Sequence, residues 1–164
     1  MQMHLVVKIH ADAYVHGMVS DRAPSDAVIR AWAHLVRAQG AVLTAVEAEL
    51  KRAGFPPLAW YDVLLELSRA PREGLRPFEL EHELLFAQYN LSRLLDRLEK
   101  AGLVERRHCP EDARGQIVAI TDAGRALLRR MWPIYRAAIA RHLGDKLSEP
   151  EAARLAALLG KLLG

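Results

Sequence analysis

A change of hydrophobic period in the second half of the chain constrains its fold more than any other feature. Between residues 87 and 101 the leucines recur at intervals of three and four, which places them on one face of an α-helix: Leu91, Leu94, Leu95 and Leu98. After Gly102 the pattern changes to two runs typical of β-strands, at 104–107 and 116–121. A polar loop, 108–115, joins these runs, so the sequence predicts a helix followed by an antiparallel hairpin.

Two further helices are expected directly before this segment. One runs from the double proline at 56–57 to about Arg69, and a short one occupies 77–84. Only Leu85 and Phe86 separate the short helix from the leucine-bearing one, so these two helices must cross at a steep angle. Helix, tight turn, helix and hairpin follow one another in this order in winged helix-turn-helix domains. The predicted fold class is mainly α, with a winged helix-turn-helix core and a two-stranded β-hairpin wing.

Long helices flank this core on both sides. The first runs from Ser25 to near Ala53 and is about 40 Å long. This length exceeds the width of the hydrophobic core that a chain of this size can form. The last opens at a capping box at 148–151 and carries a leucine stripe. Both apolar stripes require a partner surface, so we expect a homodimer. The expected organisation is an N-terminal extension at 1–24, an N-terminal dimerisation helix at 25–57, the winged helix-turn-helix region at 58–121 and C-terminal dimerisation helices at 122–164.

The face opposite the leucines carries side chains of the types that read DNA. Arginine pairs with guanine, glutamine and asparagine pair with adenine, and serine and tyrosine hydroxyls reach phosphate. These types occupy the helix at 87–101 as Gln88, Tyr89, Asn90, Ser92, Arg93 and Arg97. The hairpin adds three cations on a thin protrusion: Arg106, Arg107 and Arg114. We therefore expect double-stranded DNA as the partner, with the helix in the major groove.

Two other interpretations of this surface stay open. Its charges can be a solvated helix face with ion pairs three and four residues apart, formed by Arg93, Asp96, Arg97, Glu99 and Lys100. The same face can also bind a protein partner in a winged-helix module that lacks specific DNA binding. A salt titration separates DNA from protein as the partner, because counterion release makes DNA affinity fall steeply with salt.

Composition excludes several classes of protein. Lys and Arg total 23 against 20 for Asp and Glu, a net charge of +3 that is compatible with a polyanionic partner. The single cysteine, Cys109, cannot form an intrachain disulfide, and the chain lacks a membrane-length apolar run and a signal-peptide core. Catalytic motifs such as Gly-x-Ser-x-Gly or His-Glu-x-x-His are also missing. We expect a cytoplasmic protein that is not an enzyme, with no membrane partner, metal or cofactor.

Three stretches together resemble the signature of the MarR family of bacterial transcriptional regulators. They are the run from Leu91 to Arg106, the loop from Pro110 to Gly115, and the segment from Thr121 to Gly124. The resemblance is strong from about 58 to 125 and extends to the flanking helices by length and order. It implies a homodimer joined through its N- and C-terminal helices that acts most often as a repressor. The twofold symmetry of such a dimer requires a pseudo-palindromic operator.

The resemblance also implies how DNA is held. The helix at 87–101 becomes the recognition helix, and in the wing Asp112 orients Arg114 into the minor groove. One departure concerns residues 87–90, which stand where the family usually has small hydroxyl residues. This departure predicts a weakened N-cap and a different set of bases read.

A small-molecule effector, commonly an aromatic or phenolic acid, is implied by the same resemblance. Its pocket is expected between the dimer helices and the DNA-binding lobe. Aromatic walls can come from Trp32, Trp60 and Tyr61. A carboxylate can be gripped from one helix face by Arg30, His34 and Arg37. The ordinary alternatives are core or dimer packing for the tryptophans and surface charge for Arg30 and Arg37.

Overall fold

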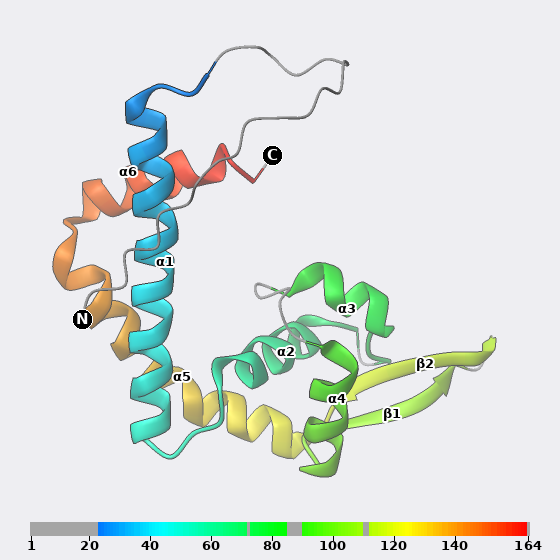
Figure 1. Ribbon diagram of the computed structural model, residues 1–164. Coiled ribbons are helices and arrows are strands. Elements are labelled where there is room, and N and C mark those ends of the chain that lie inside the picture. Colours follow the sequence, from blue (N-terminus) through cyan, green and yellow to red (C-terminus); the bar gives the residue numbers. More distant parts are fainter. Residues whose placement is uncertain (1–22, 72, 85–89, 110–111, 164) are drawn as a thin grey trace, which may run out of the picture. The chain divides into compact units, whose positions relative to one another are not determined.

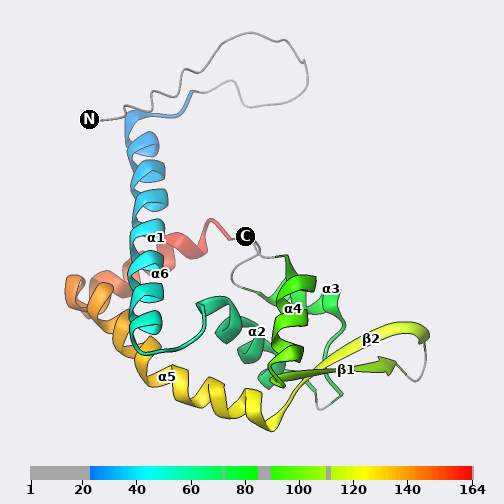
Figure 2. The same ribbon diagram turned by 60° about the horizontal axis from the view of Figure 1, so that its bottom comes forward.

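The computed structural model describes residues 23–71, 73–84, 90–109 and 112–163 (Figures 1 and 2). The described chain forms two compact parts, which are divided between residues 35 and 36. In the first part, Ser25 Oγ accepts a hydrogen bond from Val28 N at 3.4 Å, and α1 (Asp26–Arg52) begins. Three large apolar side chains of this part, Val28, Ile29 and Trp32, are exposed. The predicted long helix is confirmed, and nearly all of the predicted N-terminal extension lies outside the described residues.

Within the second part, α2 (Leu58–Arg69) and α3 (Pro77–Glu83) form where the sequence predicts them. Glu47 of α1 accepts a hydrogen bond from Leu58 N at 3.0 Å and so satisfies the first amide of α2. Proline at the first position of α3 lacks an N–H that the helix would leave unpaired in any case.

The recognition helix predicted at 87–101 is shorter than expected. It is α4 (Leu91–Lys100), and its N-cap is Asn90, whose Oδ1 accepts a hydrogen bond from Arg93 N at 3.1 Å. Asparagine is among the best N-cap residues, so the predicted helix start at Ala87 and the predicted weak cap are both wrong. Because α3 ends at Glu83, the connection between the two helices is also longer than the two residues expected.

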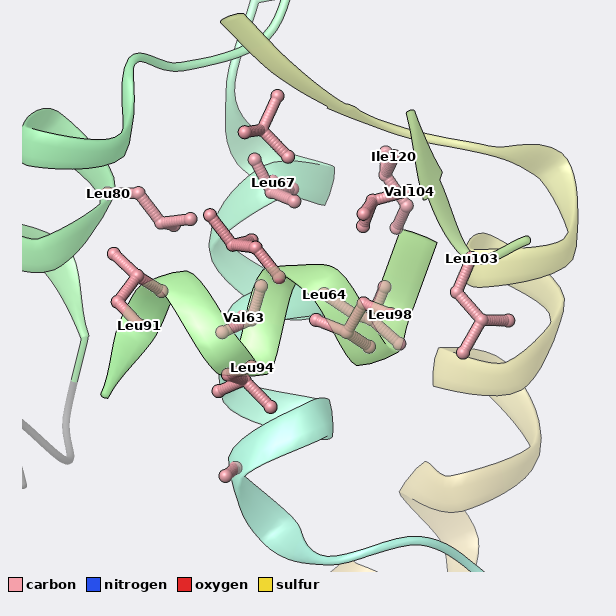
Figure 3. Packing of buried hydrophobic residues seen from close by; sticks show 13 residues of the cluster. Val63, Leu64, Leu67, Leu80, Leu91, Leu94, Leu98, Leu103, Val104 and Ile120 are labelled. Carbon is pink, nitrogen blue, oxygen red and sulfur yellow. The ribbon is translucent and has the colours of Figure 1, made fainter. Parts of the chain in front are cut away.

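The leucines of α4 form the centre of the first core, as their spacing predicts (Figure 3). All four lie against α2, α3 and the base of the hairpin, and Leu98 is completely buried. Burying a leucine side chain contributes about 2 kcal/mol, so this face holds α4 firmly and leaves its opposite face to solvent. The buried members from other elements are Ala59, Val63, Leu64, Leu67, Leu80, Leu103, Val104, Val118 and Ile120.

The hairpin consists of β1 (Val104–Cys109) and β2 (Asp112–Ile120), which pair antiparallel from the Val104–Ile120 pair outward. The strands are longer than predicted, because they include most of the residues assigned to the loop. On the other edge of β2, Leu75 N donates to Val118 O at 3.0 Å and Val118 N donates to Leu75 O at 2.8 Å. In both views the strands extend beyond α3 and α4 (Figures 1 and 2).

The C-terminal elements are α5 (Asp122–His142), the 3₁₀ turn η1 (Gly144–Lys146) and α6 (Glu149–Gly160). Thr121 caps α5 through a hydrogen bond that its Oγ1 accepts from Gly124 N at 3.1 Å. The capping box before α6 is confirmed, because Glu151 accepts hydrogen bonds from Ser148 N at 2.9 Å and Ser148 Oγ at 2.6 Å. None of the described helices combines the length and apolar character that crossing a membrane requires.

A second core joins the later turns of α1 to α2 and α5, and its buried residues are Val46, Leu50, Leu58, Tyr61, Met131 and Ala138. At its edge, Glu49 accepts a hydrogen bond from Arg141 Nη1 at 2.5 Å and lies 3.1 Å from His142 Nε2. These contacts with Arg141 and His142 lower the pKa of Glu49 to about 2. The carboxylate therefore stays charged and ties the end of α1 to the end of α5.

Candidate nucleic-acid interface

The outer face of α4 presents three of the predicted DNA-reading residues to solvent. Ser92, Arg93 and Arg97 are all exposed. Neither arginine forms an ion pair with any part of the chain that the structure describes. The described residues therefore do not show the alternative interpretation, in which Arg93 and Arg97 form ion pairs along the helix. Both guanidinium groups are available to a partner.

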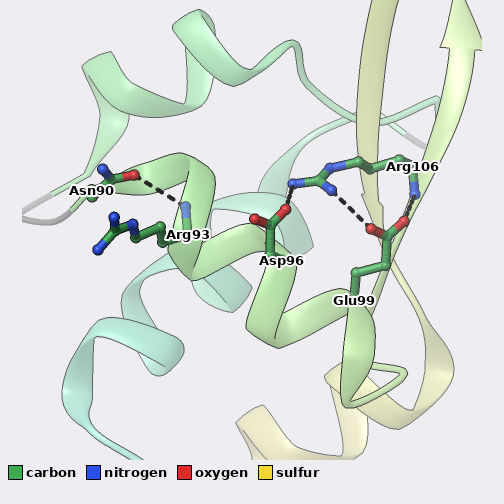
Figure 4. A network of polar contacts seen from close by, with 5 residues as sticks. All are labelled: Asn90, Arg93, Asp96, Glu99 and Arg106. Atoms are coloured by element: carbon green, nitrogen blue, oxygen red, sulfur yellow. Dashed lines mark hydrogen bonds and ion pairs between the residues drawn. The ribbon is translucent and has the colours of Figure 1, made fainter.

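Asn90 lies just before the first turn of α4, as its N-cap residue. Its side-chain oxygen serves as the cap of α4, while the amide nitrogen points away from the helix (Figure 4). A bidentate pair with adenine uses the oxygen and the nitrogen together, so the capping role weakens this residue as an adenine reader. Gln88 and Tyr89 lie outside the described residues.

Arg106 takes a different place from the free wing cation that the sequence suggests. Its guanidinium lies between two carboxylates of α4, with Nη2 at 2.6 Å from Asp96 Oδ1 and Nη1 at 2.9 Å from Glu99 Oε2 (Figure 4). Its backbone N also donates to Glu99 Oε1 at 3.3 Å. The side chain is only 23% exposed. Arg106 therefore belongs to the junction of helix and hairpin, and its neighbour Arg107 is exposed and paired with Glu105.

The remaining wing residues are placed by backbone alone. Asp112 and Arg114 both lie in β2, and their side chains fall outside the described residues. Gln116, where the described side chains of β2 begin, is exposed opposite His108. The hairpin thus starts beside α4 and carries the predicted Asp112–Arg114 pair away from it.

Comparison with known proteins identifies this arrangement. Residues 53–115, which include α2 to α4 and most of the hairpin, match the model of the MarR family. YkoM of Bacillus subtilis, described as an uncharacterized HTH-type transcriptional regulator, is 31% identical over 111 residues, which are 68% of this chain and 70% of YkoM. The chain belongs to the MarR family. Its relatives are transcriptional regulators rather than enzymes, in agreement with the sequence.

Other relatives and solved structures differ in how much of this chain they match. PapX of Escherichia coli, an HTH-type transcriptional regulator, is 35% identical over 71 residues, so the match covers only 43% of either protein. The solved structure of Sco3205 from Streptomyces coelicolor, a MarR family regulator in complex with DNA, has a TM-score of 0.77 at 28% identity and covers 88% of this chain and 90% of that one. A mutant MarR of E. coli, complexed with operator DNA, has a TM-score of 0.73 at 26% identity over 85% of this chain and 97% of that one.

The predicted effector residues fall into separate places. Arg30, Trp32 and His34 are exposed on residues 23–35. Trp60 packs partly buried against the first core, which agrees with its ordinary role as a packing residue. Only Tyr61 lines a cleft, which lies between α2 and α5 and has a volume of about 490 Å³.

Three aromatic rings form one wall of this α2–α5 cleft. The ring centroids of Tyr61 and Tyr135 are 5.0 Å apart, and those of Trp132 and Tyr135 are 6.1 Å apart. Burial raises the pKa of both phenols, and the charge of Asp62 raises that of Tyr135 further, so both hydroxyls stay protonated and can donate hydrogen bonds. Arg129 lines the cleft as well and forms no ion pair within the described residues.

Sequence reasoning missed both the acidic partners of Arg106 and most of the cleft. A signal existed for the first, because Asp96 and Glu99 are three residues apart on the helix that precedes an arginine-bearing strand. A weaker sequence signal existed for the α2–α5 cleft, since Trp132 and Tyr135 share a face of α5. Their proximity to Tyr61 depends on how α5 packs on α2, which local spacing does not encode.

Proposed function

We propose that this MarR-family chain is a sequence-specific DNA-binding transcriptional regulator. The observation that carries the proposal is the exposed, unpaired arginine pair of α4, Arg93 and Arg97, beside the hairpin of a winged helix. The likeness to Sco3205, solved with DNA, supports it. In this proposal α4 enters the major groove, where Arg93 and Arg97 pair with guanines and Ser92 reaches phosphate. Asp112 orients Arg114 of the wing into the minor groove.

We further propose that the regulator is a homodimer and a repressor. Supporting the dimer, large apolar side chains are exposed near both ends of the described chain, among them Trp32 at 67%, Leu158 at 52% and Leu162 at 69%. Such side chains favour burial against a second copy of the same surface. A twofold dimer places its two recognition helices on half-sites about 10 base pairs apart.

The first prediction concerns Arg97. The Arg97→Ala variant is expected to bind its specific duplex about 5- to 150-fold more weakly, because a lost guanine pair costs about 1–3 kcal/mol. Fluorescence anisotropy across a salt series on the operator and on a scrambled duplex measures both affinity and specificity. Lys51→Ala, which removes one exposed positive charge from α1, is the matched control and should leave affinity unchanged.

The same titration decides between DNA and protein as the partner. Wild-type affinity should fall steeply with salt, with a logarithmic slope of about −0.9 for each phosphate neutralised. A flat salt response would favour the protein-interaction module. Equal affinity of wild type and Arg97→Ala would move the interface away from α4, and a footprint without a dyad would contradict the symmetric dimer.

The effector is proposed to be an aromatic or phenolic acid in the α2–α5 cleft. The three rings offer a stacking wall, and Arg129 offers an unpaired guanidinium for the carboxylate. Calorimetry with benzoates and hydroxybenzoates should show about tenfold weaker binding to Arg129→Ala. The control Arg130→Ala changes the next residue, whose guanidinium lies 5.7 Å from the Phe55 ring centroid and outside the cleft lining. Weakening by Arg30→Ala instead would place the ligand on residues 23–35.

A further inference from the structure

We infer that Arg106 is a positioning residue that locks the wing to the recognition helix α4, and that it does not contact DNA. The inference rests on the proposed function, because it concerns how two DNA-reading elements are held together. Three contacts carry it: two from the guanidinium, to Asp96 at 2.6 Å and to Glu99 at 2.9 Å, and one from the backbone N to Glu99 at 3.3 Å.

The geometry of these contacts fixes orientation as well as distance. Glu99 accepts one hydrogen bond from the backbone N of Arg106 and another from the Arg106 guanidinium. Strand β1 therefore cannot rotate about its own axis without breaking one of these two bonds (Figure 4). Asp96 lies one turn earlier on α4 and holds the far side of the same planar guanidinium. A rigid fork that spans two carboxylates is a property of arginine, which the single ammonium of lysine does not share.

The hairpin is held on its other strand as well. Leu75 pairs with Val118 of β2 through two backbone hydrogen bonds of 3.0 and 2.8 Å. The base of the wing is therefore clamped from both edges, on β2 by the segment before α3 and on β1 by α4 through Arg106. Replacing Arg106 would remove both guanidinium contacts from the β1 edge, which would then keep only the backbone contact with Glu99 and the burial of Val104 in the first core, so the angle between wing and helix would be less firmly fixed.

Charge explains why Arg106 should not serve as a phosphate contact. One guanidinium faces two carboxylates, so the Arg106–Asp96–Glu99 cluster carries a net charge of about −1 and attracts phosphate poorly. Arg106 also neutralises part of the negative charge of Asp96 and Glu99 on one side of α4. The other side of α4, with Arg93 and Arg97, is free to approach DNA. Because Asp96 is 58% and Glu99 40% exposed, the pairs add little to global stability, and their effect is expected in binding.

The test measures DNA binding and hairpin dynamics in the full-length chain. Arg106→Gln should weaken operator binding about tenfold, which is the usual strength of coupling between contacting groups, while the salt slope stays at the wild-type value. In the Asp96→Asn/Glu99→Gln background, adding Arg106→Gln should have no further effect. Amide exchange in β1 and β2 should be faster in Arg106→Gln than in Arg107→Gln, which removes the same charge from the same strand.

Two outcomes would overturn this assignment. A salt slope reduced by about one per protomer, with an undiminished effect in the Asp96→Asn/Glu99→Gln background, would make Arg106 a phosphate contact. Unchanged affinity and unchanged exchange in the hairpin would leave it a surface ion pair without consequence. If wild type binds no duplex, the proposed function fails on its own, and the exchange rates still decide whether Arg106 holds the wing.

Discussion

Replacing Gly124 with alanine is expected to lower the free energy of unfolding by about 3 kcal/mol, which is typical of forcing a methyl group into a filled core. A Cβ atom at this buried position would lie 2.2 Å from the Leu103 carbonyl oxygen and 2.8 Å from Ile120 Cγ1. The carbonyl cannot easily move, because it accepts a hydrogen bond from Thr121 N at 3.1 Å. Urea unfolding followed by circular dichroism measures the loss.

The higher helix propensity of alanine opposes the expected loss of stability at Gly124, so the control is a helical glycine whose replacement creates no overlap. Alanine is better than glycine within a helix by about 1 kcal/mol, so a site without contacts should gain stability from the same change. Gly40 lies inside α1, and a Cβ there meets nothing within 4 Å in the described part of the chain. Gly40→Ala should therefore match or exceed wild type. If Gly124→Ala also did so, α5 would not pack against Leu103 as closely as the structure has it.

The core could be predicted from sequence because its pattern is local. Four leucines at helical spacing, a glycine that ends the helix at φ +70° and the loss of helical periodicity after it define α4 and the start of β1 without knowledge of the remaining chain. The beginning of α4 was predicted wrongly for a physical reason. Helical periodicity extends back to Ala87, but the Asn90 side chain competes for the first free amide and begins the helix at Leu91.

The sequence predicted which types of residue form the interface, but only partly which role each residue has. Arg93, Arg97 and Arg106 look equivalent in the sequence, as cations on or near a polar helix face. The structure separates them, because the pairing of β1 with β2 brings Arg106 back onto α4, where Asp96 and Glu99 lie within reach. Tertiary proximity of this kind follows from strand register, which the length of the predicted loop did not fix.

The largest effect is expected at Gly74, where two penalties combine. Its φ of +100° is a backbone conformation that side chains rarely adopt, and a Cβ would lie 2.2 Å from Val118 O and 2.8 Å from Ile117 Cγ2. Backbone strain and overpacking each cost about 1–3 kcal/mol, so Gly74→Ala should lose about 4 kcal/mol in urea unfolding. Leu75 follows directly and holds β2, so DNA affinity of the folded variant should fall as well.

Gly54 provides the comparison that separates these two penalties. Its φ is +75°, and a Cβ there meets nothing within 4 Å among the described residues, so Gly54→Ala carries backbone strain without overlap. It should lose only about 1 kcal/mol and leave DNA affinity unchanged. Equal losses at Gly54 and Gly74 would show that the backbone of the Leu75–Val118 bridge gives way at little cost. The clamp on the β2 edge of the wing would then be weak, and Arg106 on the β1 edge would have the larger part in fixing the angle of the wing.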